Sequence, residues 1–170
     1  MAITPNGFVA GEKDDTSWVS KADWKEFVRA VKKAGNVVMG RRTYEVALKE
    51  KQFPIAGVLN IVMTSNKKLL AKGEWDSVLF TDESPVGVLK HLREKGFRTA
   101  FIGGGGKVSG SFMKQDLIDE LYLSVMPVVV NPGVRIFEGA RLASRLKFID
   151  MAQTAKDEIQ LHYKVLKTKK

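Results

Sequence analysis

The stretch NVVMGRRTY at residues 36–44 joins an apolar run to a glycine, two arginines and a threonine. The apolar run at 36–39 predicts a buried strand, and a short helix is expected from about Thr43 to Lys49. A glycine lets a ligand approach the backbone, a helix N-terminus attracts anions, and arginine matches phosphate oxygens. The stretch therefore predicts a phosphate site beginning at Gly40. The alternative is a surface helix that Thr43 caps, with both arginines in solvent.

On either side of this stretch, the first two-thirds of the chain alternate helix and strand patterns. Residues 20–34 have apolar side chains at helical spacing, with a start signal at Ser20 and a stop at Gly35. The clearest helix is predicted at residues 84–96. Ser84 suits the N-cap, Pro85 suits the first turn, and Gly96 suits the position just after the helix ends. Strands are expected at 58–64, 77–80 and 97–102, and a further helix from about 107 to 114.

The last third contains LIDELYLSVMPVVV, LKFIDMAQTA and EIQLHYKVL, which read as strands with no helix between them. The whole pattern predicts a three-layer α/β domain with helices on both faces of a mostly parallel central sheet and an antiparallel C-terminal edge. No repeat or linker interrupts residues 1–170, so a single domain is expected. In such sheets ligands bind outside the carboxyl ends of the strands.

Two further loops at predicted strand ends suit anions. Gly103 to Gly106 follow a strand directly, and each glycine costs about 0.5–1 kcal/mol relative to alanine, so four in a row indicate a backbone cradle for a diphosphate. The spacing is neither the usual dinucleotide fingerprint nor a P-loop. Thr64 to Lys68 close another strand with hydroxyls, an amide and two lysines, for which an ordinary polar turn is the alternative. One extended ligand with several phosphates would explain all three loops.

Composition narrows the functional classes. The 170 residues carry a formal net charge of +9, which suits either nucleic acid or phosphorylated small molecules, and no nucleic-acid module accompanies it. The absence of cysteine excludes disulfides, thiolate metal sites and a cysteine nucleophile. His91 and His162 lie in predicted structural elements, so no metal site is expected. No apolar segment reaches the ~18 residues of a membrane span and no signal peptide is visible, so a cytoplasmic protein is expected.

Several motifs in order resemble a known family. MGRRTYE at 39–45, MTSN at 63–66 and FIGGGG at 101–106 are similar to the dihydrofolate reductase-like fold. PVVVNPGVRIFEG at 127–139, together with NGFVAG near the start, resembles the reductase domain of the riboflavin-pathway deaminase-reductase, the C-terminal half of RibD. The resemblance covers about residues 4 to 166 and implies an NADPH-dependent reductase whose substrate is an aminopyrimidine ribose phosphate.

The resemblance also implies how the site residues divide the extended NADPH molecule. The pyrophosphate and adenosine phosphate would lie against Gly40, Arg41, Arg42 and Thr43. The adenosine 2′-phosphate would lie beside Thr64, Ser65 and Asn66. The diphosphate and nicotinamide would rest on Gly103, Gly104, Gly105, Gly106, Lys107 and Val108. The loop NGFVAG would cover the nicotinamide, with Ala2 and Val9 near its carboxamide.

Asp23 matches the position of the carboxylate that assists protonation in dihydrofolate reductases. Hydride transfer otherwise needs mainly a well-held nicotinamide in a pocket closed to water. Asp23 also stands three residues after Ser20, where an acid serves a helix start, so the sequence leaves both roles open. Only MAIT precedes PNGFVAG, which is shorter than the family's first strand, and Thr16-Ser17-Trp18 replaces the tryptophan-proline of folate enzymes.

Three hypotheses follow from these observations. The first is a stand-alone reductase of the riboflavin-pathway type, because no deaminase motif is present. The second is a reductase of a pterin or another small heterocycle. The third, from a different class, is a non-catalytic binder of nucleotide or nucleic acid, which the predicted core positions of the aromatic residues disfavour. A homodimer is expected, because relatives with this tail dimerise and PVVV at 127–130 predicts an apolar edge strand.

Overall fold

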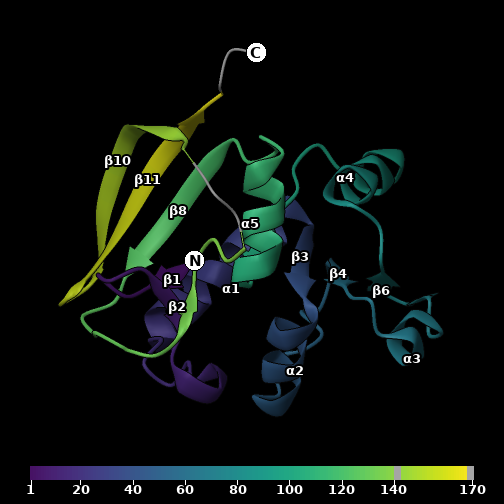
Figure 1. Ribbon diagram of the computed structural model, residues 1–170, viewed down its shortest axis with the longest axis horizontal. Coiled ribbons are helices and arrows are strands. Elements are labelled where there is room, and N and C mark those ends of the chain that lie inside the picture. Colours follow the sequence, from purple (N-terminus) through teal and green to yellow (C-terminus); the bar gives the residue numbers. More distant parts are fainter. Residues whose placement is uncertain (140–142, 168–170) are drawn as a thin grey trace.

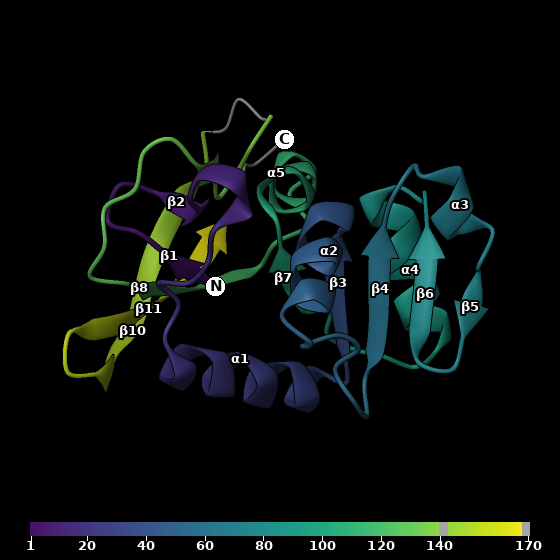
Figure 2. The ribbon, with the colours of Figure 1, turned by 90° about the horizontal axis from the view of Figure 1, so that it is seen from below.

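The computed structural model describes residues 1–139 and 143–167, and helices flank its larger sheet, the central layer of the α/β part. Five strands are hydrogen-bonded in the order β5-β6-β4-β3-β7 (Figures 1 and 2). They are β3 (Asn36–Gly40), β4 (Leu59–Met63), β5 (Glu74–Trp75), β6 (Val78–Thr81) and β7 (Ile102–Gly104). All neighbours are parallel except β5 and β6. The C-terminal ends of β7, β3, β4 and β6 therefore lie along one edge.

Helices cover both faces of this sheet, as the sequence predicts (Figure 2). They are α1 (Lys21–Ala34), α2 (Arg41–Lys49), α3 (Lys67–Leu70), α4 (Pro85–Glu94) and α5 (Gly106–Lys114). Alternate residues of β3 point to opposite faces. Val37 packs in a cluster with Val31 of α1 and Tyr44 of α2, whereas Val38 packs with Val88 of α4 and Phe112 of α5. This arrangement confirms the three-layer α/β/α fold.

The C-terminal strands form a second, largely antiparallel sheet in the order β1-β8-β11-β10. They are β1 (Ala2–Ile3), β8 (Glu120–Val125), β10 (Arg145–Ala155) and β11 (Glu158–Leu166). A small pair consists of β2 (Phe8–Ala10) and β9 (Val134–Arg135), and the 3₁₀ turn η1 (Glu12–Asp14) follows β2. The predicted antiparallel strands are thus present, hydrogen-bonded as a sheet of their own.

The helix boundaries follow the predicted signals closely. The Ser20 hydroxyl accepts a hydrogen bond from the Asp23 N–H at 3.0 Å, and Gly35 ends α1 with a φ of 74°. The Ser84 hydroxyl caps α4 by accepting from the Gly87 N–H at 3.2 Å. By contrast, α2 begins at Arg41 rather than Thr43, because Gly40 occupies the cap position.

Two predicted strands differ from the structure. The strand expected at 97–102 begins only at Ile102, because the Asn36 side chain donates to the Thr99 carbonyl at 2.7 Å and accepts from the Phe101 N–H at 3.1 Å. These two backbone groups are hydrogen-bonded to the Asn36 side chain and are therefore not available for hydrogen bonds to a neighbouring strand. The apolar edge strand expected at 127–130 does not form. Its first residue is a proline, which has no N–H to donate to a ladder.

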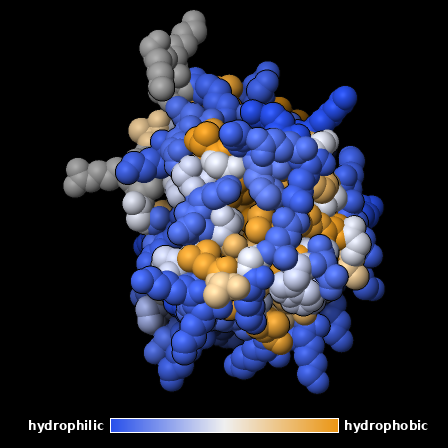
Figure 3. All heavy atoms as spheres, turned by 90° about the vertical axis from the view of Figure 1, so that its right-hand side faces the viewer, coloured by the Kyte–Doolittle hydropathy of each residue, from blue (hydrophilic) through white to orange (hydrophobic). Residues whose placement is uncertain are grey.

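The surface at the α3, α4 and β6 end of the molecule is mainly hydrophilic, with apolar residues in small groups between charged ones (Figure 3). No helix within residues 1–139 and 143–167 is long and apolar enough to cross a membrane.

The buried side chain of Asn60 holds together the entrance to β4. It accepts from the Ile55 N–H at 3.0 Å and donates to the carbonyls of Ile55, Val58 and Ser77. Asn60→Ala would remove the side-chain partner of the Ile55 N–H and of the Ile55 and Val58 carbonyls, so we expect the free energy of unfolding to fall by about 2–4 kcal/mol in urea denaturation. The control Gln115→Ala removes one exposed hydrogen bond and should change stability by less than about 0.5 kcal/mol. A loss that small for Asn60→Ala would contradict this role.

Candidate functional site

The four parallel strands end in register along one edge of the central sheet. Gly40 at the end of β3 is opposite Met63 of β4, which is opposite Thr81 of β6. On the other side of β3, Met39 is opposite Gly104 of β7. The structure therefore brings the three loops singled out in the sequence side by side, each directly after a strand end.

Two helix N-termini at this edge lack a side-chain cap. The cap residues of α2 and α5 are Gly40 and Gly105, and neither helix start receives a side-chain hydrogen bond. The other three α-helices in the described part of the chain are capped by Ser20, Asn66 and Ser84. The first N–H groups of α2 and α5 have no intrahelical partners and are left to other acceptors. Both helix starts also carry positive partial charge.

These two uncapped helix starts adjoin each other. A methyl group added at Gly40 would lie 3.1 Å from Val108 Cγ2 of α5, and one added at Gly105 would lie 3.1 Å from Thr43 Oγ1 of α2. Two sets of N–H donors without a partner among the described residues thus converge where β3 and β7 end. Such a site suits a ligand with two linked anionic groups, and a diphosphate has that chemistry.

Packing and backbone conformation account for most of the glycine loop. A methyl group at Gly103 would lie only 2.7 Å from Val37 Cγ2, and one at Gly106 would collide with the carbonyl oxygen of Arg135. Gly104 has a φ of 114°, which side chains rarely adopt. Close packing and backbone conformation therefore explain three of the four glycines. Gly105 has an ordinary φ of −83° and stands at the uncapped start of α5.

The two arginines of the first loop are each paired with an acid. Arg41 contacts Glu45 one turn along α2 at 2.7 Å, and Arg42 binds Asp14 of η1, its Nε lying 3.2 Å from Asp14 Oδ2. Their side chains are 47% and 54% exposed, so both guanidinium groups remain at the surface beside the start of α2. The simple alternative of two solvated arginines is therefore incomplete, because Arg42 also ties η1 to α2.

The loop after β4 contributes one free hydroxyl. Asn66 is committed to capping α3, since its side chain accepts from the Lys68 and Leu69 N–H groups, and Thr64 Oγ1 accepts from the Asn66 N–H at 3.1 Å. Ser65 is exposed and forms no side-chain hydrogen bond within the described residues. A pocket of 240 Å³ lies here, lined by Met63, Thr64, Ser65, Thr81, Asp82 and Glu83.

Asp23 lies in the first turn of α1 and is only 7% exposed. Its N–H is capped by Ser20, whose hydroxyl also donates to Glu158 Oε2 at 2.8 Å. Within the described residues the Asp23 carboxylate accepts no hydrogen bond, so the reciprocal bond of a capping box is missing. Phe27, one turn along the same helix, reaches within 3.4 Å of a methyl group placed on Gly103. Met1 joins the two places, because Asp23 attracts its buried N-terminal ammonium and its Cε lies 3.4 Å from a methyl group placed on Gly104. The start of α1 therefore adjoins the glycine loop.

The NGFVAG loop reaches the start of α5 through β9. Val9 lies in β2, which pairs with β9, and a methyl group at Gly133 would collide with the Ala10 carbonyl. Arg135 of β9 packs its guanidinium 4.8 Å from the centre of the Phe8 ring, while its carbonyl lies against Gly106. Ala2 lies in β1, opposite Ser124 of β8.

Lys107 is exposed in the first turn of α5 and has no ion pair in the described part of the chain. Sequence reasoning missed Arg135 and Asp82, because only strand pairing brings them to this edge.

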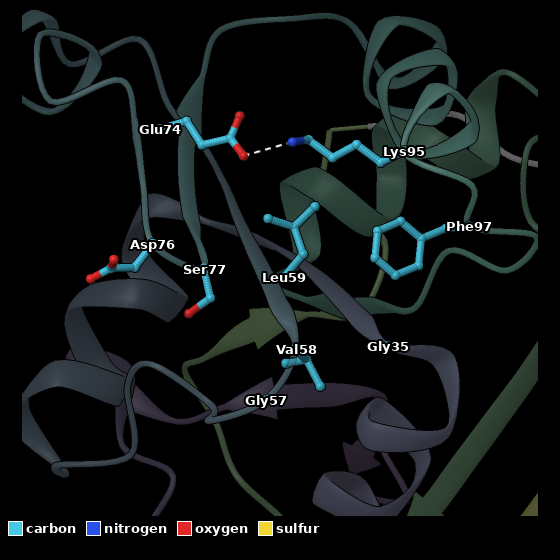
Figure 4. Close-up of a pocket in the computed structure, with 9 residues that line it drawn as sticks. All are labelled: Gly35, Gly57, Val58, Leu59, Glu74, Asp76, Ser77, Lys95 and Phe97. Atoms are coloured by element: carbon cyan, nitrogen blue, oxygen red, sulfur yellow. Dashed lines mark hydrogen bonds and ion pairs between the residues drawn. The ribbon is translucent and has the colours of Figure 1, made fainter.

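A second pocket, larger than the one beside Ser65, lies at the other end of the sheet. It has a volume of 610 Å³ and an apolar floor that includes Leu59 and Phe97 (Figure 4). An ion pair of 2.7 Å between Glu74 and Lys95 spans its rim. Leu59 is the first residue of β4, so this pocket lies at the N-terminal ends of the strands, away from the glycine loop. Within the described residues, no cluster of histidine and acidic side chains suits a metal ion.

Comparisons with known proteins identify a family and a fold. The family described as RibD C-terminal domain matches residues 1–160. The uncharacterized protein YwjB of Bacillus subtilis (strain 168) is 26% identical over an alignment of 170 positions, which covers 96% of this chain and 94% of that protein.

Two solved structures show the same fold. A protein from Shewanella sp. PV-4 assigned to riboflavin biosynthesis is similar with a TM-score of 0.82 and 22% identity, covering 98% of this chain and 97% of that one. A dihydrofolate reductase from Enterococcus faecalis, complexed with NADP(H), is similar with a TM-score of 0.72 and 20% identity, covering 96% and 92%.

Proposed function

The chain belongs to the RibD C-terminal domain family, and from this premise we propose that it is an oxidoreductase that transfers hydride from NADPH to a small heterocyclic substrate. The observation that carries the proposal is the pair of uncapped helix starts at Gly40 and Gly105, which offers backbone donors to a diphosphate at the ends of neighbouring strands. The dihydrofolate reductase that shares the fold was crystallised with NADP(H), which supports a nicotinamide cofactor.

Each part of the edge has a task in this proposal. The cofactor supplies the hydride when bound. Backbone N–H groups at the starts of α2 and α5 hold its diphosphate, with Arg41, Arg42 and Lys107 nearby as cations. Thr64 and Ser65 flank the adenosine 2′-phosphate. Ala2 and Val9 border the nicotinamide.

Asp23 takes the role of proton donor to a substrate nitrogen. Its carboxylate is buried, lies close to the glycine loop and is not used to complete the helix cap. The buried N-terminal ammonium of Met1 attracts this carboxylate, which accepts no hydrogen bond within the described residues. Its oxygens are therefore left to a substrate group.

The substrate class is tested by following NADPH consumption. We propose 5-amino-6-(5-phosphoribosylamino)uracil, or a close relative of it, because of the family and the +9 charge of the chain. NADPH should be consumed when this compound is added, and no consumption would remove it as the substrate. Dihydrofolate in the same assay tests a pterin reductase, which the likeness to dihydrofolate reductase supports.

We also propose that two copies of the chain associate through β10. The first nine residues of this strand are exposed, and its outer edge has no partner among the described residues. Leu146, Phe148 and Met151 are 42%, 53% and 64% exposed. These three side chains lie on the same face of the sheet, because they are opposite Val165, Tyr163 and Leu161 of β11. A bulge after Phe148 shifts the register by one residue and brings Met151 to that face.

A second copy suits this surface because a free strand edge pairs with an identical edge. The exposed apolar side chains on this one face are Leu146, Phe148, Met151 and Ile159, so edge pairing and this apolar face would be buried together.

The double variant Phe148→Asp/Met151→Asp should therefore be monomeric in light scattering, because it places two charges in the proposed apolar contact. The control Trp75→Asp changes a side chain of similar exposure, 49%, in β5 at the other end of the central sheet, and should leave the dimer intact. A monomeric unmodified protein, or a dimer in the double variant, would contradict the proposal.

A further inference from the structure

Three neighbouring strand ends are followed by a cation, a hydroxyl residue and an acid, and the last two of these line one pocket. Gly40, Met63 and Thr81 are opposite one another in β3, β4 and β6, and the next residues are Arg41, Thr64 and Asp82. Neighbouring strands lie about 4.8 Å apart, so the outer two strand ends are about 10 Å from each other. The loop of Thr64 and Ser65 lies between the cation and the acid.

Asp82 is the uncommitted acid of this pocket. It is exposed and has no ion pair or hydrogen-bonded partner within the described residues, while lining the 240 Å³ pocket with Thr64 and Ser65. The Thr64 N–H donates to the Thr81 carbonyl at 2.8 Å, which fixes the two loops against each other. Its neighbour Glu83 is differently placed, because the Glu83 carboxylate folds against the first turn of α4, with Oε2 3.2 Å from a methyl group placed on Gly87.

We propose that Asp82 sets the preference between NADPH and NADH by penalising the 2′-phosphate. The inference rests on the proposed function, which puts the adenosine ribose beside Thr64 and Ser65. A phosphate monoester carries up to about two negative charges near neutral pH, so a carboxylate facing it repels it. The same carboxylate accepts a hydrogen bond from the free 2′-hydroxyl of NADH, as acids do in dinucleotide sites that select NADH.

Arg41 works in the opposite sense. Its guanidinium is paired with Glu45 and half exposed, so it is only partly available to a phosphate. The structure thus combines a partly neutralised cation with an unpaired acid around one ribose site. This balance makes the chain accept both cofactors, with a smaller preference for NADPH than Arg41 and Ser65 alone would give.

Asp82→Asn is expected to increase the affinity for NADPH. A misfolded variant would lose affinity, so the expected result cannot come from misfolding. The Asp82 carboxylate and the 2′-phosphate would lie several ångströms apart in a partly solvated site. Removing the carboxylate is therefore expected to tighten the binding of NADPH about tenfold. NADH should bind equally well or slightly more weakly. Dissociation constants for both cofactors are measured by calorimetry at low and high salt, and the gain for NADPH should shrink as salt rises.

The matched control is Asp76→Asn, the same chemical change at the opposite edge of the sheet, where Asp76 borders the larger pocket. It should leave the ratio of the two dissociation constants unchanged. The inference is overturned if Asp82→Asn shifts that ratio less than twofold, or if Asp76→Asn shifts it as much. If the unmodified protein binds neither cofactor, the proposed function itself fails and the inference falls with it.

Discussion

Gly40→Asp is expected to weaken NADPH binding by at least about a hundredfold while leaving the protein folded. Gly40 caps α2 with an extended backbone, φ −86° and ψ 164°, which aspartate adopts without strain. The new carboxylate would accept the free N–H groups of the first turn and place a negative charge where the diphosphate belongs. Losing one or two charge-assisted hydrogen bonds costs about 3 kcal/mol, or roughly a hundredfold in affinity.

The stability readout separates this explanation from damage to the fold. A side-chain cap stabilises a helix by about 1 kcal/mol, which offsets the tight contact of the new Cβ with Val108. The melting temperature of Gly40→Asp should therefore stay within a few degrees of the unmodified protein. Gly40→Ala makes the same contact with Val108 without the carboxylate, and should weaken NADPH only a few-fold. An equal loss in the two variants would show that packing, and not the free N–H groups, controls binding.

Asp23→Asn is expected to slow hydride transfer at least about a hundredfold with little change in NADPH affinity. Proton transfer by a positioned side chain contributes about 10²–10⁴-fold to a rate, and asparagine keeps the size of the side chain but cannot give up a proton. The Ser20 cap would survive, because it uses the Asp23 backbone N–H. Single-turnover oxidation of NADPH with whichever substrate proves active measures the effect.

Glu158→Gln provides a matched control for Asp23→Asn. Glu158 is also buried at the start of α1, where it accepts from the Ser20 hydroxyl, but the proposal gives it no part in the reaction. Its replacement should lower stability without a comparable loss of rate. If Asp23→Asn instead lowers the free energy of unfolding and leaves the single-turnover rate intact, Asp23 serves the helix start and not the reaction.

The helices and their order were predictable because their signals are local. Ser20, Gly35 and Ser84 act on residues within one turn of themselves, so the boundaries of α1 and the start of α4 follow from the sequence. The strand pattern was equally clear wherever apolar residues are buried on both faces, as in β3 and β4. The three anion-suited loops were predictable for the same reason, since each directly follows such a strand.

Features that depend on distant partners were not predictable in this way. The side chain of Asn36 pairs with backbone groups of the segment before β7 through hydrogen bonds spanning 63 and 65 residues. Arg42 is paired with Asp14, which lies 28 residues away. Asp82 lies beside the loop of Thr64 and Ser65 because of the register between β4 and β6, and no local sequence pattern reveals that register. The apolar surface of β10 likewise appears only when its bulge is known.

The most direct test of the central claim is a calorimetric titration of the unmodified protein and of Gly40→Asp with NADPH. The paired helix starts at Gly40 and Gly105 should hold the diphosphate. We therefore expect saturable binding of one NADPH per chain to the unmodified protein, with a dissociation constant in the micromolar range, about −8 kcal/mol. The same titration of folded Gly40→Asp should show binding weaker by at least about a hundredfold. Absence of binding to the unmodified protein, or equal affinity in the two, would contradict the account.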